Sequence, residues 1–395
     1  MATVLAHESE LRFELGGPAY RLMQRVGLIV GEGPSVGRRI VAFLLITWVP
    51  LLVFSLLEGR ALGATPRGAF LLDFATYARF FLAVPLLFAA EIVVAPRLRN
   101  AGLQLVHANF VRPEDLPAFE AAIARTRRRR EAFLPELIML GIALVGARFT
   151  FEQLAAGSSV ASWNSLALAG GKGLSLTGLW YHWIAVPILQ FFALRMLWRL
   201  VIWTLFLREV ARLNLNTVAT HPDRAGGLAF LGAAHVSIAI FPFALSCILS
   251  GAIGFQIYFE GASIKGFELL LAVFVVLSEL VCLGPLLMFS PLLARTRRTG
   301  LLKYSTLSGT YNRDFEGKWL KGESGPGEPL LGSADIQSLA DLGNSYRMAE
   351  EMTAFPFGRK QVVQIAIIAA LPCVPLVFLV FPMGEVLRLL AGAIL

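Results

Sequence analysis

Seven long apolar runs, separated by polar connectors, organise this chain of 395 residues. A helix needs about 20 mostly apolar residues to cross about 30 Å of hydrocarbon. Runs of roughly this length lie at residues 40–57, 77–95, 134–153, 179–206, 228–258, 267–293 and 362–381. The pattern therefore predicts an all-α, polytopic transmembrane helix bundle of about seven spans. The fourth, fifth and sixth runs exceed one crossing, so we expect them to tilt or to continue beyond the membrane as helices.

Lys and Arg are unevenly shared between the connectors. The segments 1–39, 96–133, 207–227 and 294–361 together carry 26 of them, whereas the alternate connectors carry 5. Cytoplasmic connectors are enriched in Lys and Arg. The split therefore predicts a cytoplasmic N-terminus, a C-terminus outside and an odd number of spans.

The same alternation predicts the domain organisation. Beyond a Gly- and Pro-rich stretch at 322–332, Ser333 and Asp335 have the pattern of a helix N-terminus, and apolar residues recur at helical spacing after them. We expect this helix to dock on the bundle or to lie on the membrane, and the alternative is a partner-binding module. The units are a cytoplasmic segment 1–39, spans one and two in 40–95, a basic amphipathic cytoplasmic segment 96–133, spans three to six in 134–293, a cytoplasmic loop with an amphipathic helix in 294–361, and the seventh span with an outer interfacial tail in 362–395.

Composition supports a membrane location. The chain is 56% hydrophobic and only 16% charged, against about 45–50% and about 25% in soluble domains. Its net charge of +8 could indicate nucleic acid. The positive residues flank the apolar runs, however, which favours a bilayer with anionic headgroups as the partner and no nucleic acid. The three cysteines lie within apolar runs, so we expect neither a disulfide nor a metal site nor a cofactor.

A run of arginines precedes the third predicted span. It consists of Arg125, Arg127, Arg128, Arg129 and Arg130. We interpret it as a topology anchor on anionic lipid, and specific binding of a headgroup or of nucleic acid is the alternative.

Two charges are expected deep in the bilayer. Glu279 in the sixth predicted span and Arg148 in the third both lie roughly 20 Å from the inner boundary at about 1.5 Å per residue. A charge at that depth needs a partner or water. The matching depth predicts an ion pair, which would be either structural or part of an ion or proton pathway.

A second set of ionisable residues lies nearer the cytoplasm. Glu91, Arg195, Arg199 and His235 fall roughly 7–16 Å from the inner boundary by the same rise. Arg195 and Arg199 share one helix face. They either snorkel to the headgroups or face an anion or acid site with Glu91. His235 is either a titrating group or a packed, hydrogen-bonded one. Asp73 and Arg79, at the outer start of the second span, are interpreted as interfacial.

The motif HPDRAGG precedes the fifth predicted span. Its residues His221, Asp223 and Arg224 form either a turn with Asp223 as helix cap or the polar rim of a cytoplasmic vestibule. HPDRAGGL at 221–228, together with ADIQSLADLGNSY and the later FPF within 334–357, resembles segments of uncharacterised bacterial multi-pass inner-membrane proteins. The resemblance implies a bacterial cytoplasmic membrane and no known activity.

Soluble-enzyme motifs are missing from the sequence, so we expect no enzyme activity. The buried charges and the prolines within the runs favour a channel or transporter for a small ion or solute. The alternative is a non-transporting scaffold or sensor that binds a partner or lipid through its cytoplasmic segments. The oligomeric state stays open, a homo-oligomer included.

Overall fold

The computed structural model describes residues 16–30, 35–63, 68–157, 163–168, 171–321 and 332–380. Within them almost all regular structure is helical, and the one sheet is an antiparallel pair, β1 (Ser165–Leu168) and β2 (Gly171–Leu174). The predicted outer tail after residue 381 and the loop 322–331 lie outside the described residues. The all-α polytopic bundle is confirmed.

Six helices in the described part of the chain are long and apolar enough to cross a membrane. They are Val36–Leu57, Phe74–His107, Leu176–Val210, Ala229–Glu260, Ile264–Leu320 and Arg359–Leu379. A further helix, α7 (Phe133–Gly157), coincides with the third predicted span. Seven spans and the orientation of the chain stay predictions, since helix length alone does not place a membrane.

Several spans are built from consecutive helical segments. The second comprises α4 (Phe74–Tyr77), the π-helical turn η3 (Ala78–Ala83) and α5 (Val84–His107); the fourth comprises α8 (Leu176–Trp180), the π-helical turn η5 (Tyr181–Ala185) and α9 (Val186–Val210). The fifth comprises α10 (Ala229–His235), the 3-10 turn η6 (Val236–Ala239) and α11 (Ile240–Glu260). The apolar runs underestimated the second and fourth of these helices, because a helix continues past the charged residues at the C-terminal end of a run.

Prolines produce irregular turns in the last two spans. The sixth helix contains η7 (Ile264–Phe267), α12 (Glu268–Leu283), the 3-10 turn η8 (Gly284–Phe289), α13 (Ser290–Phe315) and the π-helical turn η9 (Glu316–Leu320). The seventh contains α15 (Arg359–Ala370), η10 (Leu371–Leu376) and α16 (Val377–Val380). Pro285, Pro372 and Pro375 lie in η8 and η10, where the missing N–H of proline removes a helical hydrogen bond.

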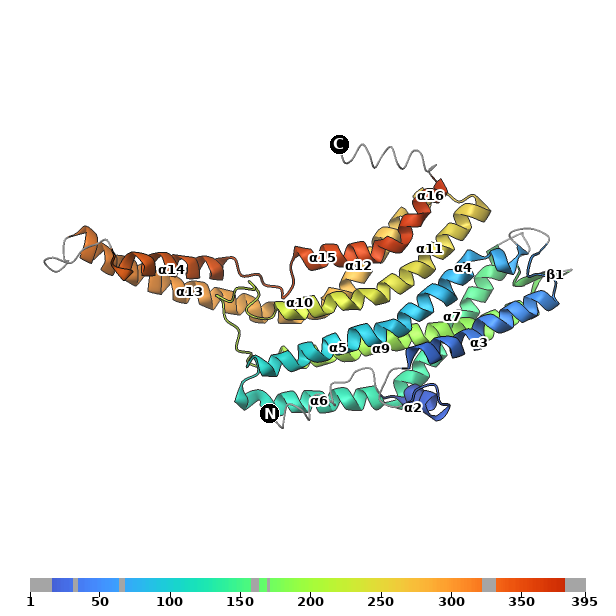
Figure 1. Ribbon diagram of the computed structural model, residues 1–395, viewed down its shortest axis with the longest axis horizontal. Helices are drawn as coiled ribbons and strands as arrows, with labels where there is room; N and C mark the ends of the chain where they lie inside the picture. Colours follow the sequence, from blue (N-terminus) through green and yellow to red (C-terminus); the bar gives the residue numbers. More distant parts are fainter. Residues whose placement is uncertain are drawn as a thin grey trace.

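The molecule is elongated (Figure 1). α5 and α9 lie alongside the α10–α11 helix, and α3 (Val36–Leu57) flanks one half of them. α13 pairs with α14 (Ala334–Glu350) in a helical hairpin that projects from one end of the bundle. The sheet lies at the opposite end. Ser333 caps α14 by accepting a hydrogen bond from the backbone of Asp335, as the sequence predicted.

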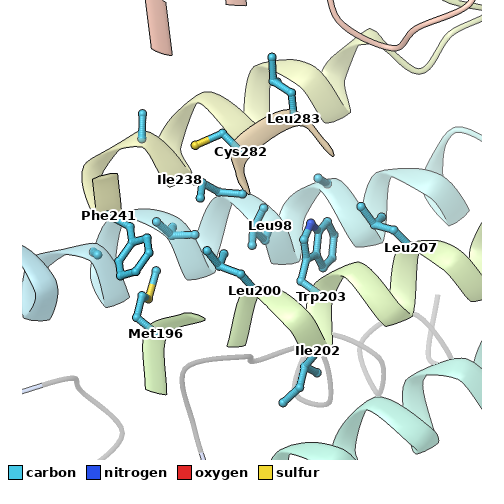
Figure 2. Packing of buried hydrophobic residues seen from close by; sticks show 14 of the residues in the cluster. Leu98, Met196, Leu200, Ile202, Trp203, Leu207, Ile238, Phe241, Cys282 and Leu283 are labelled. Carbon is cyan, nitrogen blue, oxygen red and sulfur yellow. The ribbon is translucent and has the colours of Figure 1, made fainter. Parts of the chain in front are cut away.

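The buried core lies between the long helices. Trp203, Leu207 and Leu200 of α9 pack against Leu98 of α5 and Cys282 of α12 (Figure 2). Large apolar side chains are instead exposed on α3, α7 and α12. Contiguous apolar exposure of this kind is expected where helices face lipid.

α6 (Leu116–Glu131) is the amphipathic helix of the second predicted cytoplasmic segment. Its Phe119 and Ile123 are fully buried, and the Phe119 ring contacts Phe206 of α9 at a centroid distance of 5.7 Å. α6 runs alongside α9 (Figure 1). It is therefore docked on a helix of the bundle.

Candidate functional site in the spanning bundle

Five charged side chains from four helices meet in one buried group, which we call the charge cluster. It consists of Arg39 of α3, Glu91 of α5, Glu136 of α7, and Arg195 and Arg199 of α9. Glu91 is its centre: Oε2 is 2.5 Å from Nη1 of Arg39, and Oε1 is 2.5 Å from Nη1 of Arg199. Nε of Arg195 is 3.4 Å from Oε1 of Glu136.

The cluster is almost dry. Its side chains are only 2–11% exposed. Moving an ion from water into such a place costs several kcal/mol unless an opposite charge compensates for it. Among the described residues, Glu91 and Glu136 supply that compensation for the three arginines. Arg39 is further stabilised by Phe88, because its guanidinium lies 5.0 Å from the centre of that ring.

The N-terminal helix α2 (Pro18–Arg25) covers the cluster. Nη2 of Arg195 donates to the carbonyl of Gly16 at 3.2 Å, and the backbone N–H of Ala19 donates to Oε2 of Glu136 at 2.6 Å. Glu136 therefore serves both as an acid for Arg195 and as an acceptor for the first turn of α2.

Sequence reasoning identified Glu91, Arg195 and Arg199 but missed the other two members. The structure brings the three together, and the arginines turn into the bundle, with Arg195 only 4% exposed. Arg39 was grouped with the cytoplasmic flank because it directly precedes the first apolar run. Glu136 could have been found, since it is an acid three residues inside an apolar helix.

Four phenylalanine rings form a layer beside the cluster, which we call the aromatic plug. Phe43, Phe80, Phe88 and Phe192 come from α3, η3, α5 and α9. The Phe88 and Phe192 centroids are 4.9 Å apart, and Phe43 is 6.1–6.3 Å from the other three. On one side Phe88 meets Arg39, and on the other Phe80 lies 6.4 Å from the ring of Tyr181. The plug thus connects the charge cluster to the wall of a cavity.

That cavity, the outer cavity, has a volume of about 510 Å³ and lies at the end of the bundle predicted to face outside. Its walls come from α4 and η3, from η5 and α9, and from α11. The lining is Asp73, Ala75, Arg79, Trp163, Asn164, Tyr181, His182, Val186, Leu189, Gln190, Ala193, Leu245, Ile248, Ala252, Phe255, Gln256 and Glu260. Gln190 precedes Arg195 by five residues, or about 7.5 Å of helix rise, so the cavity ends close to the charge cluster.

Polar side chains of the outer cavity are held by hydrogen bonds between distant segments. Nη1 of Arg79 donates to the Tyr181 hydroxyl at 2.6 Å. Oδ2 of Asp73 accepts from the Trp163 indole at 2.9 Å and from the Thr76 hydroxyl at 2.8 Å. The interpretation of Asp73 and Arg79 as merely interfacial was therefore incomplete. Their partners lie up to 102 residues away, which no local pattern reveals.

The predicted ion pair between Glu279 and Arg148 is wrong. Both carboxyl oxygens of Glu279 are buried and form no ion pair within the described residues, and Arg148 is exposed on α7. α7 packs against α9 and η5, whereas α12 packs against α15. Equal depth placed both charges in one layer of the bilayer, but they lie on different sides of the bundle.

His235 is a packed structural residue. It is fully buried, and its Nε2 accepts a hydrogen bond from the Trp203 indole at 2.8 Å. Since an indole N–H can only donate, Nδ1 carries the ring proton and donates it to the Cys282 carbonyl at 2.6 Å. The histidine thereby joins α9, α10 and α12, and it belongs to neither the cavity nor the cluster.

Asp223 organises the HPDRAGG loop. Its carboxylate accepts from the N–H groups of Ala225 and Gly227 in the loop and of Ala229, the first residue of α10, at 2.9–3.0 Å. Oδ1 lies 2.8 Å from Nδ1 of His221. Burial raises the pKa of Asp223, but these N–H groups and His221 outweigh it and lower the pKa below its usual value.

The two motifs of the sequence resemblance meet in space. The carbonyl of Arg224 accepts from the Thr353 N–H at 2.7 Å, and its guanidinium pairs with Glu351 at 3.0 Å. Gly232 of α10 faces the Pro356 carbonyl so closely that a Cβ would stand 2.4 Å from it. Arg224 and Gly232 therefore hold the loop and the start of α10 against the segment 351–357, while His221 and Asp223 interact within the loop.

The arginine run is divided between two faces of α6. Arg125 and Arg129 each pair with Glu209 of α9 at 2.8 Å and so dock α6. Arg127 and Arg128 are exposed, and the side chain of Arg130 lies beside Gly16. Arg127 and Arg128, which are exposed and do not pair with Glu209, remain the candidates for lipid headgroups.

The fold defines a polytopic helical membrane protein. Among the described residues, no three or more His, Cys, Asp or Glu side chains gather into a group that could hold a metal. Comparison of the chain with protein-family models, curated proteins and solved structures gave no match. The resemblance to bacterial inner-membrane proteins therefore stays a prediction.

Proposed function

We propose that this protein is a channel or transporter that moves a small solute or ion across a bacterial cytoplasmic membrane, with its N-terminus in the cytoplasm and its C-terminus outside. It acts without enzyme chemistry, cofactor or metal. The protein is embedded in the lipid bilayer, and exposed arginines such as Arg128 contact anionic headgroups.

One observation carries this proposal: a cavity with a few polar side chains, an aromatic plug and a buried charge cluster follow one another along α9. Ligand sites are concavities with mostly apolar walls and a few placed polar groups, and hydrophobic constrictions close a path by excluding water. The cavity of about 510 Å³ fits this description, because Asp73, Arg79 and Gln190 line it among apolar residues. The conformation described is closed, because the plug and the cluster stand between the cavity and the predicted cytoplasmic end.

Cysteine labelling tests the path. After replacement of the three native cysteines, a membrane-impermeant maleimide added from outside should modify Ala193→Cys in the cavity floor. It should not modify Met196→Cys, which is one turn closer to the cluster and only 6% exposed. Labelling of Ala193→Cys from the cytoplasmic side alone would contradict the proposed access.

Uptake tests transport itself. Proteoliposomes should accumulate at least one of benzoate, glycine and rubidium ion faster than empty liposomes. Maleimide should then block uptake by Ala193→Cys while leaving the cysteine-free protein unaffected. Unchanged uptake by maleimide-treated Ala193→Cys would show that the path does not pass through the outer cavity.

A second candidate function is a membrane scaffold or sensor. The helical hairpin of α13 and α14 favours it, because it projects beyond the bundle (Figure 1). Its tip is closed by Asp335, which accepts hydrogen bonds from Lys318 at 3.0 Å and from the Trp319 indole at 2.9 Å. If the hairpin binds a partner, its deletion should abolish partner capture and leave uptake intact.

A further inference from the structure

We infer that the outer cavity binds the carboxylate of a small organic acid with an apolar body, and that Arg79 is its anion ligand. This inference deepens the proposed function, on which it rests for the claim that the ligand is carried.

Arg79 is oriented so that its guanidinium can bind an anion. Its guanidinium lies in a predicted span, where a lone charge is costly. The Tyr181 hydroxyl holds Nη1 at 2.6 Å, and the Tyr181 ring lies 5.9 Å from Cζ. Both contacts orient the cation without neutralising it. Among the described residues no carboxylate lies within ion-pair distance of it.

Two acids line the cavity, Asp73 and Glu260, and neither forms an ion pair with Arg79. Asp73 accepts three hydrogen bonds, from the Thr76 backbone, the Thr76 hydroxyl and the Trp163 indole. Asp73 therefore caps α4 and orients Trp163, and it does not pair with Arg79. The site therefore offers a positive group whose complement has to come from a ligand, and an arginine fork matches a carboxylate in a bidentate way.

Irregular helix geometry directs these side chains to the cavity. The described chain contains three π-helical turns, and two of them border this cavity. η3 supplies Arg79, and η5 supplies Tyr181 and His182. Single π-helical turns re-aim side chains and occur frequently at functional sites. Two of them facing one cavity from different spans point to a built site.

The remaining walls define the rest of the ligand. Leu189, Leu245, Ile248 and Phe255 are apolar and suit an aliphatic or aromatic body. Oδ1 of Asn164, a residue only 8% exposed, is buried without a hydrogen-bond partner and offers a place for a donor group on that body.

Benzoate is the probe for this site, with benzamide and benzylammonium as neutral and cationic counterparts of similar shape. Binding of radiolabelled benzoate to the full chain in detergent should be displaced by benzoate about tenfold or more effectively than by benzamide. Benzylammonium should compete weakest. Equal competition by all three, or preference for benzylammonium, would overturn the inference.

Variants locate the site. Arg79→Gln should weaken benzoate binding about tenfold or more, and Arg79→Lys should retain part of it. Tyr181→Phe should weaken it severalfold, since the guanidinium loses its support. Lys265→Gln removes an exposed cation from the same end of the molecule and should change nothing. If Arg79→Gln does not fold, the lysine and Tyr181 variants with the charge series decide the question.

Uptake separates this inference from the proposed function. Benzoate binding that depends on Arg79 but is never followed by uptake would leave the site standing and remove the transport proposal. Uptake of another probe, together with unchanged benzoate binding by Arg79→Gln, would support transport and remove the proposed carboxylate site.

Discussion

The charge cluster and the outer cavity both border α9, but the arginines in them have opposite surroundings. In the cluster Glu91 lies within 2.5 Å of two guanidinium groups, and the whole group is nearly inaccessible to water. In the outer cavity, whose volume is about 510 Å³, Arg79 is held by Tyr181 and not by a carboxylate. We infer that the first arrangement stabilises the fold, whereas the second leaves the Arg79 guanidinium available to an anionic ligand.

The difference shows that burial and pairing have to be considered together when a charge within a span is interpreted. A paired buried charge is expensive to break, because its partners are stranded when it is removed. An oriented charge beside a cavity can be removed at little cost to the fold. Four substitutions test this contrast, from the largest expected effect to the smallest.

Glu91→Gln should be the most damaging change. It leaves three arginines with Glu136 as their only acid in the cluster, and loss of one partner from a buried pair costs about 3–5 kcal/mol. We expect that loss in the free energy of unfolding in detergent, measured by denaturant titration. Glu268→Gln, at an exposed position of α12, is the matched control. Equal stability of the two variants would mean that the cluster does not hold the helices together.

Phe192→Ala should come next. Removing a buried ring costs about 3–5 kcal/mol, and half-burial of Phe192 brings the expected loss to roughly 2–3 kcal/mol. The variant should also let an external maleimide reach Met196→Cys, because the plug separates that position from the cavity. Phe378→Ala on α16, whose side chain is 46% exposed, should do neither. Persistent protection of Met196→Cys would show that the plug is not the barrier.

Asp223→Ala tests a carboxylate that is satisfied by backbone N–H groups instead of arginines. Loss of a carboxylate that accepts from N–H groups at a helix start costs about 0.5–2 kcal/mol. Since Asp223 is partly exposed and accepts from only one N–H of α10, we expect a loss in the lower half of this range. Since its pKa is lowered in the folded protein, its contribution is present above the unfolded pKa of about 3.9 and disappears as pH falls through the folded pKa.

The wild-type protein should therefore lose more stability between pH 5 and pH 3 than Asp223→Ala does. Asp314→Ala, at an exposed position of α13, serves as the control and should keep the wild-type acid profile. Identical acid profiles for all three proteins would count against the role of Asp223 as a cap.

Sequence patterns predicted which residues lie in the bundle and at what depth, but not which way they face. Apolar runs located the spans, and common depth correctly grouped Glu91 with Arg195 and Arg199, but it also included His235, which lies apart from them. The same argument failed for Glu279 and Arg148, because depth is one coordinate and the direction around the bundle axis is another.

The outer cavity was beyond sequence reasoning for a related reason. Its key contact joins residues 102 positions apart, and π-helical turns shift the helical register that a periodicity argument assumes. A charge placed at the end of an apolar run also gives no sign of whether it faces lipid, water or a cavity.

Arg79→Gln should have the smallest effect on stability, although it too removes a charge from a span. It removes the hydrogen bond to the Tyr181 hydroxyl, worth about 0.5–1.5 kcal/mol, and the contact with the Tyr181 ring, but it strands no acid and relieves the cost of a charge within a span. Its free energy of unfolding should therefore stay within roughly 1 kcal/mol of the wild-type value while benzoate binding falls. A loss as large as that of Glu91→Gln would mean that Arg79 has a structural partner, and the outer cavity would then be a second charge cluster and not a site held open for a ligand.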